Sequence, residues 1–264
     1  MAFDIDYDNS AAVSGSEAYG AKWQAQAADF RDSLGQRARL GVPYGATARE
    51  KADLFLPEGT ATGLTIFVHG GYWRSRHRHD WSHFAAGALA RGDLVAMPSY
   101  TLAPEARIAR ITLQVAHAVA QLADEVPDLP IRLVGHSAGG HLVARMMAAD
   151  VMLPEAVADR LTHVMPISPV SDLRPLVGLK LNEDLRLDEA EAESESPALL
   201  PRVRGTPATV WVGAAELPAF VDQARSLAEA WDVPLVQAEG RHHFDVIEPL
   251  LDADSEMLER LFAV

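Results

Sequence analysis

The sequence of 264 residues contains no cysteine, and its acidic residues outnumber its basic ones. The lack of cysteine excludes disulfides, a thiolate nucleophile and metal sites built on thiolates. With 37 acidic residues against 23 lysines and arginines, the formal net charge is −14. We therefore expect that neither nucleic acid nor an anionic membrane surface is the main partner.

The sequence also lacks the segments that direct a protein to a membrane or anchor it there. Residues 1–10 carry three aspartates and no basic stretch that leads into an apolar run, so no secretory signal is expected. No apolar run is long enough to cross a bilayer. These features predict a cytoplasmic protein without membrane contact.

No internal repeat and no Gly/Ser-rich or Pro-rich linker divides the chain, which favours one domain over residues 1–264. Short apolar runs alternate with longer helical patterns, as in a mostly parallel α/β sheet with helices on both faces. Strands are predicted at residues 52–56, 64–68, 94–97, 131–134, 164–167, 209–212 and 235–237. Helices are predicted at residues 16–34, 81–91, 108–125, 141–149, 220–231 and 246–261.

Two segments depart from this alternation of strands and helices. Residues 1–40 are predicted to form an N-terminal helical extension before the sheet begins. Residues 171–197 are acidic and Leu-rich, and they show no strand pattern. We expect this second segment to pass over one end of the sheet as a small cap.

The motif with the clearest chemistry is Gly135-His-Ser-Ala-Gly139, which matches G-x-S-x-G between a predicted strand and a helical segment. In that setting the serine occupies a strained turn, and the glycines leave room for neighbouring backbone. The hydroxyl then projects above the edge of the sheet. We therefore predict that Ser137 is a nucleophile; a Gly-rich turn with a structural serine is the weaker alternative.

A second glycine-containing segment, His69-Gly-Gly-Tyr-Trp73, follows the strand predicted at residues 64–68. Backbone N–H groups in such a loop can stabilise the negative charge that develops on a carbonyl oxygen during acyl transfer. We predict that Gly71, together with Gly70 or Tyr72, supplies one side of this oxyanion hole and the N–H of Ala138 the other. An ordinary turn after a strand is the alternative.

The acid and the base of a catalytic triad should follow the nucleophile in that order along the chain. Glu216 is the only carboxylate in the turn after the penultimate predicted strand, so we predict it as the acid, with Asp222 as the alternative. Two adjacent histidines follow the last strand. We predict His243 as the base rather than His242, because an aromatic residue and a helix from about residue 245 follow it. His243 would take the proton of Ser137 while the acid fixes its tautomer.

Residues 74–83 contain several arginines and histidines, which raises the possibility of a metal site. Their spacing matches no familiar ligand pattern, and the neighbouring arginines would repel a cation. We expect a polar loop at the entrance of the active site and no metal. Beside it, Trp73, Tyr72 and His69 are predicted to contact the substrate, with simple packing as the alternative for the large aromatic side chains.

Several segments resemble the kynurenine formamidase (arylformamidase) branch of the α/β-hydrolases. The similarity begins at His69-Gly-Gly-Tyr-Trp73, where that family carries H-G-G-x-W. It continues through Ser99-Tyr-Thr-Leu-Ala-Pro-Glu105, Gly135-His-Ser-Ala-Gly-Gly-His141, the Leu-rich segment after Asp172, and His243-Phe244. The resemblance covers most of the chain from about residue 51 onward.

This resemblance implies an α/β-hydrolase fold and hydrolysis of N-formyl-L-kynurenine to kynurenine and formate, without metal or other cofactor. It assigns the triad to Ser137, Glu216 and His243, and the oxyanion hole to Gly70 and Gly71. The family usually carries aspartate where this chain has glutamate, so the acid is the least secure transfer.

The H-G-G-x-W segment also occurs in related esterases, which leaves the substrate open. One alternative is a short-chain carboxylesterase or thioesterase; another is a catalytically silent hydrolase-fold protein that binds a ligand or partner. We expect a small acyl amide or ester as the substrate. The oligomeric state, with a homodimer as one option, is open.

Overall fold

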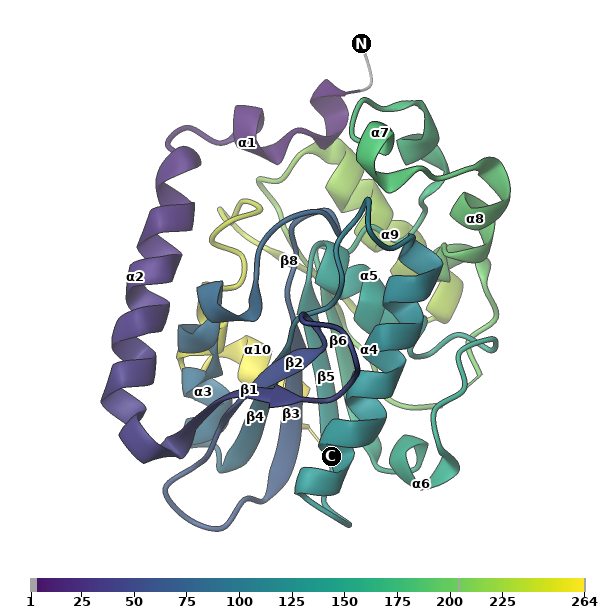
Figure 1. The fold of residues 1–264 in the computed structure, drawn as a ribbon. Coiled ribbons are helices and arrows are strands. Elements are labelled where there is room, and N and C mark those ends of the chain that lie inside the picture. Colours follow the sequence, from purple (N-terminus) through teal and green to yellow (C-terminus); the bar gives the residue numbers. More distant parts are fainter. Residues whose placement is uncertain (1–3, 204, 264) are drawn as a thin grey trace.

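The computed structural model describes residues 4–203 and 205–263, and it contains an eight-stranded sheet with helices on both faces (Figure 1). The strands are β1 (Ala38–Pro43), β2 (Lys51–Phe55), β3 (Gly63–Val68), β4 (Asp93–Pro98), β5 (Ile131–His136), β6 (Leu161–Ile167), β7 (Val210–Gly213) and β8 (Leu235–Ala238). Their order across the sheet is β1-β2-β4-β3-β5-β6-β7-β8. From β4 to β8 along that order all strands are parallel, whereas β2 pairs antiparallel with β1 and β4.

The strands predicted from apolar runs are confirmed as β2 to β8, with bounds that differ by a few residues. All residues of β3, β4 and β5 are buried. Helices cover both faces of the sheet here, so neither side of these strands needs polar residues. The continuous apolar runs in the sequence have this cause.

Strand β1 was not predicted, and its first residues, 38–40, fall in the N-terminal segment that we expected to be helical. Its residues are exposed or half-buried, and it includes Gly41 and Pro43. Its pairing with β2 shifts register between Arg39 and Val42. An exposed edge strand of this composition has neither an apolar run nor a regular alternation, so the sequence carries no period-2 signal for it.

The helices lie in two groups, one on each face of the sheet. On one face α2, α3 and α10 pack over one buried cluster, and on the other α4, α5 and α9 pack over a second (Figure 1). The bounds are α1 (Asn9–Ala12), α2 (Glu17–Leu34), α3 (Ala86–Ala90), α4 (Ile108–Leu122), α5 (Ala138–Arg145), α6 (Glu155–Ala158), α7 (Asn182–Leu185), α8 (Glu189–Ser194), α9 (Pro218–Trp231) and α10 (Glu256–Leu261).

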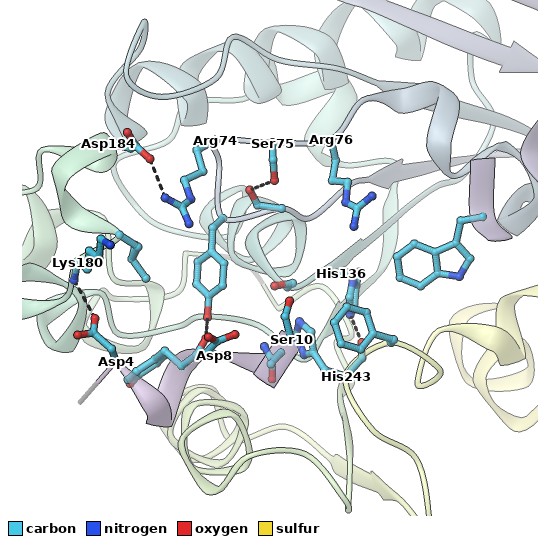
Figure 2. A pocket seen from close by; sticks show the side chains of 18 of the residues that line it. Asp4, Asp8, Ser10, Arg74, Ser75, Arg76, His136, Lys180, Asp184 and His243 are labelled. Carbon is cyan, nitrogen blue, oxygen red and sulfur yellow. Dashed lines mark hydrogen bonds and ion pairs between the residues drawn. The ribbon is translucent and has the colours of Figure 1, made fainter. Parts of the chain in front are cut away.

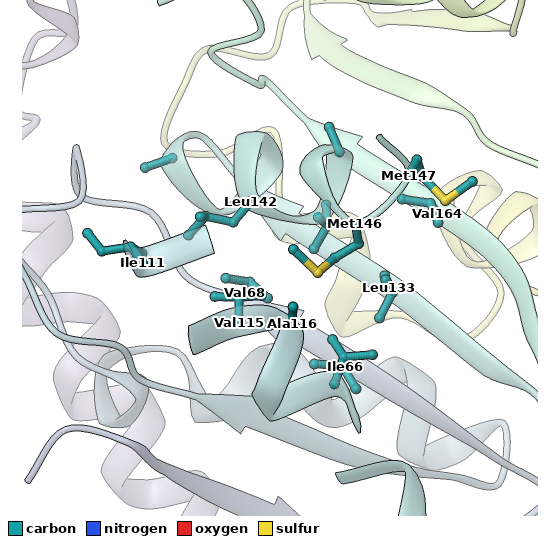
Figure 3. Close-up of a cluster of buried hydrophobic side chains, with 14 of the residues drawn as sticks. Ile66, Val68, Ile111, Val115, Ala116, Leu133, Leu142, Met146, Met147 and Val164 are labelled. Carbon is teal, nitrogen blue, oxygen red and sulfur yellow. The ribbon is translucent and has the colours of Figure 1, made fainter. Parts of the chain in front are cut away.

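Helix α4 buries the apolar face that its sequence period predicts. Its buried residues include the five that recur at three- and four-residue steps, namely Ile108, Ile111, Val115, Val119 and Leu122. Figure 3 shows Val115 in the same cluster as Val68 of β3 and Leu142 of α5. The segment that carries Ser137 is therefore held between the sheet and this helix.

The helix predicted at residues 246–261 is wrong in its first half. A 3-10 turn at Glu248–Leu251 comes first, and α10 begins only at Glu256. Pro249 cannot donate a backbone hydrogen bond, which favours the short turn over a continuing helix. The Ser255 side chain then accepts a hydrogen bond from the N–H of Leu258 and caps the new helix.

The segment predicted as a cap consists of short helical turns, with a 3-10 turn at Arg174–Gly178 followed by α7 and α8. Figure 1 shows α7 at the same end of the molecule as α1. Ion pairs join this segment to the helices below it: Arg107 contacts Glu191, and Arg145 contacts Glu195 at 3.1 Å.

Candidate active site

Ser137 lies between β5 and α5 in a left-handed conformation, with φ 57° and ψ −119°. Only glycine fits at the two flanking positions, 135 and 139, because a side chain at either would clash with neighbouring backbone. A Cβ atom on Gly135 would lie 2.2 Å from the carbonyl oxygen of Gly139, and one on Gly139 would lie 1.9 Å from that of Val68. The G-x-S-x-G spacing is therefore required by close contacts between backbone segments.

The side chain of Ser137 lines a cavity of about 700 Å³, although the residue as a whole is only 3% exposed. Its backbone N–H donates to the carbonyl oxygen of Ile167 at 2.8 Å, which fixes the turn to the neighbouring strand β6. Among the described residues, its hydroxyl has no hydrogen-bond partner. The hydroxyl is thus free to turn toward His243, which lines the same cavity.

His243 and Glu216 form a buried pair beside this cavity. Nδ1 of His243 donates to Oε2 of Glu216 at 2.6 Å. The other carboxylate oxygen of Glu216 accepts the backbone N–H of Gly213 at 2.8 Å and the hydroxyl of Ser168. Both oxygens are held, so the carboxylate fixes the histidine ring with Nδ1 protonated and Nε2 as the acceptor.

The alternative acid and base lie elsewhere. Asp222 is on the exposed side of α9, where it pairs with Arg225 at 2.6 Å. His242 lies outside the cavity lining and faces Asp245, and its Nε2 is 3.4 Å from the hydroxyl of Tyr19. Among the residues that the structure describes, only the predicted pair brings a carboxylate and an imidazole together at this cavity.

The loop after β3 packs directly against the nucleophile turn. A Cβ atom on Gly70 would lie 2.7 Å from the carbonyl oxygen of His136 and 3.0 Å from the Cβ of Ser137. Gly71 has a φ of 110° and Tyr72 a φ of 48°. Among the described residues, the N–H groups of Gly70, Gly71 and Tyr72 have no hydrogen-bond acceptor. Ala138 is the first residue of α5, so its N–H has no acceptor within the helix.

Two of the residues predicted to contact the substrate do not reach the cavity. Trp73 is fully buried and meets the ring of His141 edge-on, with ring centroids 5.0 Å apart. His69 is also buried, stacks on Tyr100 and donates from Nδ1 to the carbonyl oxygen of Gly70 at 2.8 Å. Burial lowers the pKa of His69 to about 3, so this ring is neutral.

These corrections to Trp73 and His69 have one cause. Both side chains are buried beneath the loop and do not line the cavity. In that position they support the backbone of the loop. Of the three predicted contacts only Tyr72 lines the cavity, and its hydroxyl donates to the carbonyl oxygen of Tyr7 at 2.7 Å.

His136, next to the nucleophile, also lines the cavity. Its Nε2 donates to the carbonyl oxygen of His243 at 2.9 Å (Figure 2). Burial lowers the pKa of His136 well below its ordinary value, and the nearby His243 adds to the effect. A neutral His136 ring therefore supports the backbone of His243 without placing a positive charge beside it.

Segments far apart in the sequence supply the rest of the cavity wall. Residues of the N-terminal extension, including Asp8 and Ser10, line one side, and Lys180 and Asp184 of the 171–197 segment line another (Figure 2). Aromatic side chains complete the wall: Trp23, Trp81 and Phe244. The contribution of residues 4–10 was not predicted, because it depends on contacts with distant residues rather than on a local motif.

Within residues 4–203 and 205–263, no group of three or more histidine, aspartate or glutamate side chains is arranged to hold a metal ion. In the same part of the chain, no helix has both the length and the apolar composition needed to cross a bilayer.

Comparisons with known proteins agree with this geometry. A family profile described as "alpha/beta hydrolase fold" matches residues 65–247. The kynurenine formamidase of Salmo salar is 28% identical over 84% of this chain and 80% of its own length. That of Drosophila melanogaster is 28% identical over 79% of this chain and 76% of its own length.

Solved structures extend the comparison. A protein from Silicibacter sp. TM1040 described as a "putative thioesterase" is 52% identical, covers 100% of both chains and superposes with a TM-score of 0.97. A truncated carbohydrate esterase from gut microbiota, at 16% identity, covers 84% of this chain and 92% of its own with a TM-score of 0.66, and it supports the fold alone. The chain therefore belongs to the α/β-hydrolase family, in which it is a hydrolase similar to the kynurenine formamidases.

Proposed function

We propose that this protein is an arylformamidase-type serine hydrolase, which cleaves N-formyl-L-kynurenine to L-kynurenine and formate. The observation that carries the proposal is the buried His243–Glu216 pair, 2.6 Å apart, at the cavity that Ser137 lines. The relatives named kynurenine formamidase support the formyl amide as the substrate.

In the proposed mechanism, the hydroxyl of Ser137 attacks the formyl carbonyl carbon while Nε2 of His243 accepts its proton. The tetrahedral intermediate carries a negative charge on the former carbonyl oxygen. N–H groups of Gly70, Gly71 or Tyr72 and of Ala138 would stabilise that charge. The developing imidazolium is stabilised by Glu216, which stays ionised.

Collapse of the intermediate breaks the carbon–nitrogen bond, and His243 returns the proton to the leaving aromatic amine. The formyl group then remains as an ester on Ser137. A water molecule, deprotonated by His243, attacks that ester. The bond between the formyl carbon and Oγ of Ser137 then breaks, His243 returns the proton to Oγ, and formate is released. No step requires a metal or a redox cofactor, since the acid–base pair and the backbone amides supply the chemistry.

The cavity wall supports an aromatic substrate with charged groups. Trp23, Trp81 and Phe244 supply aromatic surface, and rings pack against such surfaces in offset or edge-on arrangements. Cationic and anionic side chains stand together on the rim, among them Lys180 and Glu183. A substrate whose far end is a zwitterionic amino acid carries charges of both signs and matches this mixture.

A second candidate is hydrolysis of short acyl thioesters or esters. The resemblance to the Silicibacter protein, at 52% identity over the whole chain, favours it. The same serine, histidine and oxyanion amides serve amides, esters and thioesters, so the chemistry alone does not separate the two candidates.

A substrate panel separates them. We expect purified protein to release kynurenine from N-formyl-L-kynurenine, measured by its absorbance, with a higher kcat/KM than for p-nitrophenyl acetate or acetyl thioesters. The control is Ser137→Ala, which should abolish turnover without changing the melting temperature. Rapid cleavage of thioesters with no release of kynurenine would replace the first candidate by the second.

We propose that this activity serves tryptophan breakdown in the cytoplasm. A homodimer stays a prediction as well. Light scattering coupled to size-exclusion chromatography would measure the assembly state.

A further inference from the structure

Arg76 lines the cavity, and no described residue forms an ion pair with it. The neighbouring arginines of the same loop are neutralised: Arg74 pairs with Asp184 at 2.7 Å, and Arg78 pairs with Asp53 at 2.7 Å. Arg76 is half-buried, so its charge is less screened by water than a surface charge would be. Figure 2 shows its side chain pointing into the cavity, whereas Arg74 reaches Asp184.

Helix α2 leaves space for this guanidinium. Gly20 lies inside α2, where glycine is a poor helix former and usually has a packing reason. A Cβ atom on Gly20 would lie 2.9 Å from Nη1 of Arg76. The glycine thus permits a close approach of the guanidinium to the helix backbone and holds the side chain along one wall of the cavity.

The backbone of Arg76 is also constrained. Its φ of 75° is a left-handed conformation that residues other than glycine rarely adopt. Arg49 stabilises it, because Nη2 of Arg49 donates to the carbonyl oxygen of Arg76 at 2.7 Å and its Nε donates to that of Tyr100 at 2.7 Å. A strained residue held in this way directs its side chain to one place, as is common at binding sites.

The charges around the cavity favour binding of an anion at Arg76 over other places on the wall. Asp8 and Glu183 are acidic side chains on the wall that would repel an anion, whereas Asp184 is paired with Arg74. Lys180 is exposed at the edge, and Arg74 is already paired. An anionic group of a bound substrate is therefore most favourably placed against Arg76.

We propose that Arg76 binds the carboxylate of the substrate and so selects acyl amides or esters whose leaving group carries that charge. The inference rests on the proposed function, in which the leaving group is an aromatic amino acid. A guanidinium can donate two parallel hydrogen bonds to the two oxygens of a carboxylate, which fixes the direction of the substrate as well as its affinity. The scissile acyl group is then oriented toward Ser137.

The test compares substrates that differ in the carboxylate alone. One pair is N-formyl-L-kynurenine and its decarboxylated analogue N-formylkynuramine. The other pair is 4-acetoxybenzoate and its neutral amide, 4-acetoxybenzamide. We expect Arg76→Gln to lower kcat/KM for the two carboxylates about 10- to 100-fold and to change the neutral partners less than about threefold, since a charge-assisted hydrogen bond is lost. Arg76→Lys should restore part of the difference.

Gly20→Ala provides an independent variant that leaves the arginine in place. Alanine favours the helix, so the protein should be no less stable, but its Cβ displaces the guanidinium. We expect a selective loss for the carboxylate substrates again. The matched control is Arg110→Gln, because Arg110 is an exposed residue of α4 outside the cavity lining, and this change should leave all four kcat/KM values unchanged.

Two results would overturn the proposal: an equal loss of kcat/KM for charged and neutral substrates in Arg76→Gln, or no loss for either. The ester pair keeps this test separate from the proposed function. If wild-type protein does not cleave N-formyl-L-kynurenine, the proposed function fails, while the two acetoxy esters still decide whether Arg76 binds a carboxylate.

Discussion

At the scale of single residues, the buried carboxylate of Glu216 is held in one orientation by hydrogen bonds to both of its oxygens. The side chain of Glu216 folds back toward its own turn. One oxygen accepts the N–H of Gly213 at 2.8 Å, and the other is left for His243 at 2.6 Å. The carboxylate is therefore oriented before any substrate binds.

We expect Glu216→Gln to lower kcat about 10²- to 10⁴-fold. The amide oxygen can still accept from Gly213, which leaves the NH₂ group facing Nδ1 of His243. That arrangement favours the wrong tautomer of the histidine. Steady-state kinetics would measure the loss, and Asp222→Asn is the control, because Asp222 pairs with Arg225 on the exposed side of α9. Activity near that of the wild type in Glu216→Gln would place the acid elsewhere.

The sequence motifs predicted the residues proposed as the triad better than they predicted the side chains that line the cavity. Ser137, Glu216 and His243 follow from their places after successive strands, which the topology of the fold determines. For Trp73 and His69 the motif gives the position in the chain but not the direction of the side chain. That direction depends on the ring of His141 and on Tyr100, which the sequence does not link to them.

At the scale of elements, two glycine-containing turns hold the site together. The turn after β5 and the loop after β3 approach so closely that Gly139 contacts the backbone of Val68. The parallel pairing of β3 with β5 brings the carboxyl ends of both strands to one edge of the sheet. Strand register thus places the proposed nucleophile, Ser137, beside the loop proposed to supply the oxyanion donors.

We expect Gly139→Ala to lower the free energy of unfolding by about 1–3 kcal/mol or more and to abolish activity, because the new Cβ would overlap the carbonyl oxygen of Val68. Urea denaturation would measure the change. Gly178→Ala is the matched control: a Cβ there meets nothing within 4 Å, and the change should stay within about 0.5 kcal/mol. Equal stability of the two variants would show that the turns are not tightly packed.

Elements with a continuous apolar run or a regular helical period were predictable, as β3, β5 and α4 show. Strand β1 was not, because its edge position leaves its residues partly exposed and removes the pattern. The N-terminal wall of the cavity also escaped prediction. It depends on Tyr7, whose carbonyl accepts from Tyr72 and whose hydroxyl accepts from Gln223 at 3.1 Å, contacts between residues far apart in sequence.

At the scale of the whole molecule, several histidines are buried in the neutral form. Burial lowers the pKa of His69 and of His141 to about 3, and that of His136 well below its ordinary value. In the unfolded chain these side chains would titrate near pH 6.5. Below that pH the unfolded state binds protons that the folded state does not, so stability is full above pH 6.5 and falls as the pH drops toward 3.

We expect the free energy of unfolding to fall between pH 7 and pH 5, by about 2 kcal/mol for each fully buried histidine. Urea denaturation at several pH values would measure the slope. His141→Gln should make it shallower, since one buried titrating group is removed. His117→Gln is the control, because His117 is exposed on α4. A free energy of unfolding that is constant over this range would contradict the assignment of neutral buried rings.

The central claim is that His243 activates Ser137 for attack on an acyl carbon. Incubation with a fluorophosphonate, followed by peptide mapping in a mass spectrometer, tests it most directly. We expect a single adduct on Ser137 in wild-type protein, formed at least about a hundredfold more slowly in His243→Ala and at nearly the normal rate in His242→Ala. An adduct on another residue, or equally fast labelling of Ser137 in His243→Ala, would contradict it.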